Sequence, residues 1–196
     1  MNIFSNLFKI WLLLFFFSLI SSCIITRTPG FYSGYKRLPL AQKKRIVIIK
    51  DKDPLPELVD SVTYAITAKH LMQVVKAQAP CVIYLWSAHC SGKACISIPA
   101  FRQFCQTNGY NAVVYSEYYD FEQLSIQGVA PSSVFAINNE HYGTDYCNKY
   151  VHRFQQSLFN FFDKEFTAKY YYKYIYYDGK TLTASKPSNL DKYPWQ

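Results

Sequence analysis

The centre of the chain contains an uninterrupted run of six apolar residues, Cys81–Trp86 (CVIYLW). A strand with one solvent-exposed face alternates apolar and polar residues, whereas a continuous apolar run of this length is typical of a strand buried on both faces. Burial on both faces requires helices on both sides of a sheet. The run therefore predicts an α/β domain.

Further strands and helices alternate along the chain around this run. The predicted strands are rich in β-branched residues, and the predicted helices carry apolar residues at helical spacing. The expected order is strand Arg45–Ile49, helix Ala68–Gln78, strand Cys81–Trp86, helix Ser91–Thr107, strand Asn111–Ser116, helix Phe121–Ile126, strand Ser132–Ile137, strand Tyr142–Tyr146 and helix Asn148–Phe166. This order indicates a three-layer α/β/α domain with a central mixed sheet.

Composition and charge exclude several classes of protein. With 50% hydrophobic and 17% charged residues, the 196-residue chain can build a folded domain. The net charge is +8, but its basic residues are dispersed in short clusters such as Lys43, Lys44 and Arg45. No nucleic acid is therefore expected as a partner, and the charge suits a protein near anionic lipid. No phosphate-binding glycine loop or zinc-type Cys/His repeat is present, so no cofactor is expected.

The N-terminus resembles a bacterial lipoprotein signal peptide. Ile10–Ile20 is an uncharged run of eleven residues, which is too short to span a bilayer as a helix but has the length of a signal-peptide apolar core. It leads into Ile20-Ser21-Ser22-Cys23, which resembles the lipobox. The resemblance implies removal of residues 1–22 and attachment of acyl chains, such as palmitate, to Cys23. A simple signal peptide or an uncleaved anchor is the alternative.

Lipid on Cys23 would place the protein in the cell envelope, held on a membrane. Ile24 rather than Asp follows the cysteine, which favours the outer membrane on its periplasmic side. Residues 23–44 would then form a tether, because they contain prolines and glycines but little periodicity.

At the C-terminus, Asp178-Gly179 separates a Tyr-rich run from a Thr-rich run, which predicts a β-hairpin within Tyr170–Ala184. Its tyrosines could stack on a sugar or a peptide, or they could cover the core as an edge hairpin. The hairpin and tail would occupy residues 169–196, after an α/β domain of residues 45–168.

The segment Val82–Cys90 (VIYLWSAHC) is similar to the strand and redox motif of the thioredoxin family, in which an apolar strand ends in Trp shortly before the nucleophilic cysteine. Pro99 resembles the proline of the family's active-site helix, and Val129-Ala130-Pro131-Ser132 resembles the segment with the family's cis-proline. The resemblance implies a thioredoxin-like fold and thiol–disulfide exchange with protein thiols or disulfides of the envelope. Cys90 would be the nucleophile, and Pro131 would shape the substrate groove.

The chain departs from the family in the spacing of its cysteine pair. Four residues separate Cys90 from Cys95, whereas the family has two. A disulfide needs Cα atoms within about 7 Å, and two residues five apart in a regular helix are about 8–9 Å apart. The pair can therefore form a disulfide only if residues 91–94 form a loop before the helix begins. Cys95 would then be the resolving cysteine.

The expected reactivity of Cys90 depends on three neighbours. A helix N-terminus, Lys93 and a protonated His89 would each stabilise its thiolate. A structural disulfide or two buried thiols are the alternatives to redox activity.

Two other functions are compatible with the sequence. The same fold could be inactive and bind an envelope partner through the Tyr-rich C-terminal surface. Alternatively, Cys90 and Cys95 could bind Cu(I) together with one of His89, His141 or His152, as in copper metallochaperones of the thioredoxin fold. Of the remaining cysteines, Cys81 and Cys105 are expected in the core, and Cys147 could be partly exposed or paired with either of them.

Overall fold

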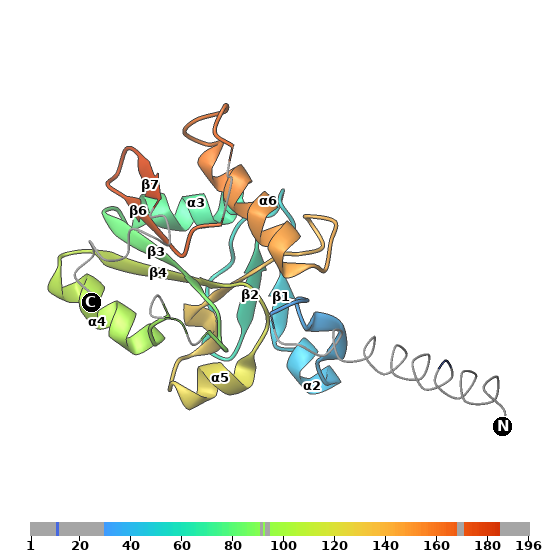
Figure 1. The fold of residues 1–196 in the computed structure, drawn as a ribbon. Coiled ribbons are helices and arrows are strands. Elements are labelled where there is room, and N and C mark those ends of the chain that lie inside the picture. Colours follow the sequence, from blue (N-terminus) through green and yellow to red (C-terminus); the bar gives the residue numbers. More distant parts are fainter. Residues whose placement is uncertain (1–10, 12–29, 91, 93–94, 168–170, 185–196) are drawn as a thin grey trace, which may run out of the picture.

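The structure is a computed structural model that describes residues 11, 30–90, 92, 95–167 and 171–184 (Figure 1). Its core is a seven-stranded mixed sheet with the order β1-β2-β5-β4-β3-β6-β7. The strands are β1 (Ile46–Ile48), β2 (Thr63–Ile66), β3 (Cys81–Trp86), β4 (Asn111–Ser116), β5 (Phe135–Ile137), β6 (Tyr174–Tyr177) and β7 (Leu182–Ala184). The first five strands are parallel to one another, and β6 and β7 continue the sheet in antiparallel pairs.

Helices cover both faces of the sheet. They are α2 (Leu40–Lys43), α3 (Ala68–Ala77), α4 (Ile98–Thr107), α5 (Phe121–Ile126) and α6 (Cys147–Phe159), with short 3-10 turns η1 (Tyr35–Arg37) and η2 (Pro131–Ser133). Helices α3 and α6 pack on one face, and α4 and α5 lie on the other (Figure 1). The predicted α/β class is thus confirmed. In the described part of the chain, no helix has the length and apolar character needed to cross a membrane.

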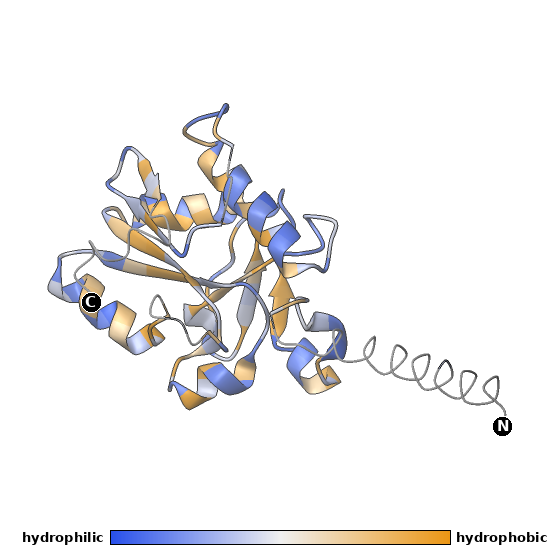
Figure 2. Cartoon of the chain, viewed as in Figure 1, coloured by the Kyte–Doolittle hydropathy of each residue, from blue (hydrophilic) through white to orange (hydrophobic). Residues whose placement is uncertain are grey.

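Strand β3 is buried on both faces, as its sequence predicts. Cys81, Ile83 and Leu85 belong to the core under α3 and α6. The alternate residues Val82, Tyr84 and Trp86 belong to the core under α4. All six side chains are at most 2% exposed. Figure 2 shows the same pattern, with apolar colour along β3 and on the helix surfaces that face the sheet.

The limits of two helices follow from local chemistry. At the start of α3, the backbone N–H of Thr67 donates to Nδ1 of His70 (3.3 Å), so buried side chains satisfy the helix end. After α4, Gly109 adopts φ +75°, a left-handed conformation that suits glycine at a helix C-terminus. Both helix ends lie within one residue of the predicted positions.

Several predicted elements differ in the structure. The helix expected over Ser91–Thr107 begins only at Ile98, and the helix expected over Asn148–Phe166 ends at Phe159. Residues 142–146 form turns rather than a strand, with one isolated bridge from Tyr146 to Tyr32. The predicted strand Ser132–Ile137 is shortened to β5 because η2 occupies its first residues. Strand β2 was not expected, since its four residues (TYAI) are too few to show a period. As a result, β5 lies between β2 and β4, and the antiparallel neighbour of β3 comes from the C-terminal segment.

The Tyr-rich segment is part of the main sheet. Strand β6 pairs directly with β3, in the register Cys81↔Tyr177 to Tyr84↔Tyr174. Tyr172, Tyr174 and Tyr177 are buried, so these side chains face the core and not solvent. The boundary predicted between residues 168 and 169 therefore separates two parts of one sheet, and Tyr170 lies outside the described residues.

Residues 30–44 of the predicted tether pack against the domain. Ser33 is fully buried, and its carbonyl accepts a hydrogen bond from Tyr119 N (3.0 Å). The ring of Tyr35 lies 5.5 Å from that of Tyr119. Only residues 23–29 remain as a connection between this packed segment and the predicted lipid site. Cys23 and, apart from Trp11, the signal peptide 1–22 lie outside the described residues.

Candidate functional site

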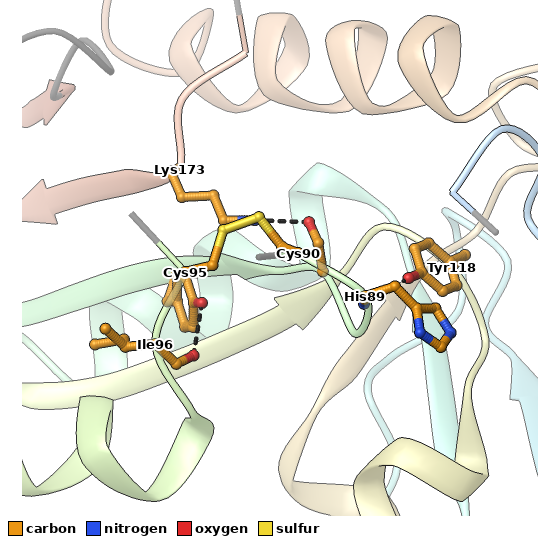
Figure 3. Close-up of a disulfide and its surroundings, with 8 residues drawn as sticks. His89, Cys90, Cys95, Ile96, Tyr118 and Lys173 are labelled. Atoms are coloured by element: carbon orange, nitrogen blue, oxygen red, sulfur yellow. Dashed lines mark hydrogen bonds between the residues drawn. A yellow bond between two sulfur atoms is a disulfide. The ribbon is translucent and has the colours of Figure 1, made fainter. Parts of the chain in front are cut away.

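Cys90 and Cys95 form a disulfide, with their Cα atoms 5.7 Å apart. Both lie in the loop that connects the C-terminal end of β3 to α4 (Figure 3). The pairing fulfils the geometric condition derived above, because the helix begins only at Ile98. Cys90 is exposed and Cys95 is half-buried. The first sulfur is thus the more accessible to a second molecule.

The late start of α4 shows that the helix N-terminus does not activate Cys90. Ser97 is the N-cap, and its Oγ accepts a hydrogen bond from Ala100 N (3.3 Å). Cys90 precedes Ile98 by eight positions, and helix-dipole effects fade beyond the first turn. The prediction of activation by the dipole is therefore wrong. Lys93, the second expected neighbour, lies outside the described residues.

Substitution of Ser97 tests this separation of helix and disulfide. The variant Ser97→Ala should lower the free energy of unfolding by about 1 kcal/mol because it removes the N-cap hydrogen bond. The rate at which dithiothreitol reduces the disulfide should stay unchanged. Urea unfolding and stopped-flow reduction measure the two quantities, and Ser125→Ala on the exposed surface of α5 is the control. Slower reduction of Ser97→Ala would show that the helix end does act on the disulfide.

The disulfide opens into a cavity of about 360 Å³. Besides the two cysteines, the loop after β3 contributes Ser87, His89 and Gly92 to the lining of this cavity. The rest of the lining comes from Gly30, from Glu117 and Tyr118 after β4, and from Tyr171 and Lys173 before β6. These residues gather here because the C-terminal ends of parallel β3 and β4 and the start of antiparallel β6 meet at one edge of the sheet.

A half-buried lysine and a half-buried glutamate lie beside the disulfide. The ammonium of Lys173 donates to Oγ of Ser87 (2.6 Å; Figure 3), and Lys173 lines the same cavity as the two cysteines. Burial lowers the pKa of Lys173 to about 8, and the charge of Glu117 opposes this shift. Burial also raises the pKa of Glu117, while Lys173 and Ser87 act to lower it. The site thus contains both a cation and a proton acceptor with shifted pKa values.

Sequence reasoning missed both of these residues. Glu117 directly follows a buried parallel strand, and functional side chains often gather where such strands end, so its position was a usable signal. Lys173 gave no such signal. It reaches the site through strand pairing, since Leu85 N in β3 donates to the Lys173 carbonyl (2.9 Å).

His89 does not lie over the disulfide. Its side chain points away from the sulfur atoms (Figure 3), with Nε2 3.0 Å from Oδ2 of Asp120. The ring stacks on Tyr118, whose hydroxyl accepts a hydrogen bond from His89 N (3.0 Å). His89 therefore holds the loop against the residues after β4, and its predicted role as a cation beside Cys90 is not supported.

Pro131 is not placed at the disulfide. Its peptide bond is trans, and the single cis peptide bond in the described residues precedes Pro80. Pro131 begins η2, its carbonyl accepts a hydrogen bond from Thr63 Oγ1 (3.4 Å), and it does not line the cavity. The segment that passes beside the disulfide is instead the one containing Lys173.

The other three cysteines within the described range are buried and unpaired. Burial raises the pKa of Cys81, Cys105 and Cys147 to about 12 in each case. The first two match the expected core positions, whereas Cys147 is neither exposed nor paired. For the copper alternative, no group of three His, Cys, Asp or Glu side chains in the described residues is close enough to hold a metal ion.

No protein-family model, curated protein or solved structure matches this chain significantly. The geometry around Cys90 and Cys95 is therefore the basis for a functional proposal.

Proposed function

We propose that this protein is a thioredoxin-like thiol–disulfide oxidoreductase that is held on a membrane of the bacterial envelope by lipid on Cys23. The observation that carries the proposal is an accessible disulfide beside a half-buried cation, Lys173. A cysteine pair kept only for stability needs neither an exposed sulfur nor a desolvated charge next to it. Perturbed ionisable groups in a cavity are typical of sites that do chemistry.

The support for a thioredoxin-like arrangement comes from the position of the pair. The loop with Cys90 and Cys95 leaves the end of a strand that is buried on both faces, and a helix follows it. The lipid anchor is supported by the residues before Cys23, and it implies an envelope location, on the periplasmic side of the outer membrane, with envelope protein thiols or disulfides as partners.

The exchange reaction follows from the accessibility of the two sulfurs. In the reduced protein, the Cys90 thiolate attacks a substrate disulfide, which forms a mixed disulfide and releases one substrate sulfur as a thiol. Cys95 then loses its proton and attacks the sulfur of Cys90, which releases the second substrate thiol. Two electrons pass from the protein dithiol to the substrate, and the reverse sequence oxidises a substrate dithiol.

The neighbouring charges have separate roles in this cycle. The ammonium of Lys173 stabilises the Cys90 thiolate, because an opposite charge nearby favours the ionised form. The carboxylate of Glu117 accepts the proton of Cys95, and its raised pKa suits it to hold that proton. Both groups line the cavity that contains the two cysteines.

A non-catalytic interaction module is the second candidate, but the structure offers it little surface. Among the described tyrosines of the C-terminal segment, Tyr172, Tyr174 and Tyr177 are buried, and Tyr171, which is exposed, lines the disulfide cavity. The partner-binding aromatic surface that this candidate needs is therefore largely absent from the described residues.

Exchange with thiols under native conditions tests the proposed function. After equilibration in reduced glutathione, alkylation should modify two cysteines together, Cys90 and Cys95, while Cys81, Cys105 and Cys147 react only after unfolding. The reduced protein should then reduce insulin disulfides faster than glutathione alone. Mass spectrometry and insulin turbidity measure these outcomes. A disulfide that resists reduction in the folded protein, or a reduced protein inert toward insulin, would refute the function.

A further inference from the structure

The segment that follows the proposed lipid site carries charges of one sign only. Between residues 24 and 50 the chain has seven basic residues and no acidic one; they are Arg27, Lys36, Arg37, Lys43, Lys44, Arg45 and Lys50. Within the described residues, none of these cations forms an ion pair, since the single ion pair found there joins His89 to Asp120. Arg37, Lys43 and Arg45 lie instead over the rings of Tyr32, Tyr35 and Phe121, so no acidic side chain of the described fold neutralises the charge of this segment.

An exposed apolar side chain lies among these cations. Leu40, the first residue of α2, is 70% exposed, and Lys36, Arg37 and Lys44 on either side of it are exposed too. An apolar residue surrounded by cations is typical of a surface that binds anionic lipid, because the cations meet the headgroups while the apolar side chain enters the interface. We call Lys36, Arg37, Leu40 and Lys44 the basic face.

The continuously described part of the chain begins beside the disulfide cavity. Gly30 lines that cavity, and a Cβ atom at this position would lie 3.7 Å from Oε1 of Glu117 and 3.5 Å from the ring of Tyr118. Gly30 lies seven positions after Cys23, and seven extended residues span at most about 25 Å. An acyl anchor on Cys23 therefore keeps the cavity close to the bilayer.

We propose that the basic face lies on the anionic headgroups of the membrane that holds the anchor, with the disulfide cavity beside the bilayer. The substrates would accordingly be disulfides or dithiols of membrane-bound proteins within reach of that surface. This proposal rests on the anchor in the proposed function, but it concerns orientation and can be tested apart from redox activity.

Fluorescence quenching by labelled lipid headgroups measures the orientation. The full acylated chain is placed in phosphatidylcholine vesicles with phosphatidylglycerol and a headgroup spin label. One sample carries a fluorophore on Cys90 in the variant Cys95→Ser. The other carries it on Lys180→Cys, with Cys90→Ser and Cys95→Ser, because Lys180 lies in the turn beyond the opposite end of β3. The fluorophore on Cys90 should be quenched about threefold more than the one at position 180. Salt near 1 M should remove this difference, because it shortens the Debye length to about 3 Å and so screens the attraction between exposed charges.

Neutralising the basic face should release the protein from this orientation. Each Lys or Arg near an anionic surface contributes about a fivefold change in equilibrium, so Lys36→Gln, Arg37→Gln and Lys44→Gln together should lower the ratio of docked to undocked protein about a hundredfold. The matched control replaces three other exposed lysines by Gln, at Lys76, Lys164 and Lys180. This control should leave the quenching of the fluorophore on Cys90 unchanged.

Three outcomes would overturn the proposal. They are equal quenching at the two positions, equal effects of the two triple variants, and orientation that persists without phosphatidylglycerol, which would point to a protein or a neutral surface as the occupant. Loss of the chain from vesicles in a high-salt wash would refute the anchor itself. Reduction of a small soluble disulfide by the unlabelled chain with both cysteines, placed in the same vesicles, reports the redox function independently, so the two failures are distinguishable.

Discussion

The variant Cys90→Ser should lose disulfide exchange completely, whereas Cys95→Ser should stop at a stable mixed disulfide with its substrate. The asymmetry follows from accessibility, because Cys90 is exposed and Cys95 is half-buried. Without Cys90, no accessible thiolate attacks the substrate. Without Cys95, the attack occurs but nothing resolves the product. Non-reducing electrophoresis and mass spectrometry of each variant, mixed with a protein disulfide, measure the trapped complex.

The control for this pair is Cys105→Ala, because Cys105 is buried in the core under α4 and has a pKa raised to about 12. Its exchange rate should match that of the unmodified protein, even though the substitution costs some stability. Mixed disulfides trapped by Cys90→Ser instead of Cys95→Ser would reverse the assigned roles. Equal activity of both variants would show that the pair is structural.

The elements nearest the site show what local sequence determines. Strands β3 and β4 and helix α5 have the predicted bounds, because continuous apolar runs and helical spacing are signals contained within each segment. The disulfide was predictable only as a condition, since five-residue spacing permits pairing in a loop and forbids it in a helix. Whether residues 91–94 lie in a loop or a helix depends on where α4 starts. That start is set by the N-cap Ser97, which was not identified from the sequence.

The neighbours of the disulfide depend on contacts between distant segments. Lys173 follows Cys90 by more than 80 positions and arrives because β6 pairs with β3 rather than forming a separate hairpin. The sequence predicted two strands after Pro131, Ser132–Ile137 and Tyr142–Tyr146, but only β5 forms there, and it is parallel to its neighbours. The pairing of β6 with β3 therefore places Lys173 beside the disulfide, where Pro131 was expected.

Substitution of this lysine should slow the reaction without removing either sulfur. In Lys173→Met, the pKa of the reduced Cys90 thiol should rise by about one unit, because a nearby cation favours the thiolate by that order. Exchange at pH 7 should then be about tenfold slower, and higher pH should restore it because the rate follows the thiolate fraction. Lys173→Arg should retain the rate at pH 7. Rates from pH 5 to 10 and thiol alkylation of Cys90 measure both quantities, with Lys76→Met as the control.

The shape of the pH profile distinguishes this electrostatic role from a loss of packing. With a pKa of about 8, Lys173 loses its charge within the range from pH 5 to 10. Above pH 8 the unmodified protein should therefore no longer react faster than Lys173→Met. Lys173→Arg should keep the advantage, because an arginine stays charged. A rate of Lys173→Met that stays tenfold low at every pH would contradict the electrostatic role.

The lowered pKa of Lys173 also predicts that the free energy of unfolding increases with pH. The folded-state pKa of about 8 lies below the ordinary lysine value of 10.5, so the unfolded chain binds more protons between these two values. Stability therefore rises with pH in that range, by about 1 kcal/mol between pH 7 and pH 9 relative to Lys173→Met. Urea unfolding at the two pH values measures the difference. An equal response of both proteins would mean that Lys173 is not desolvated, and the cation proposed to activate Cys90 would then be an ordinary surface charge.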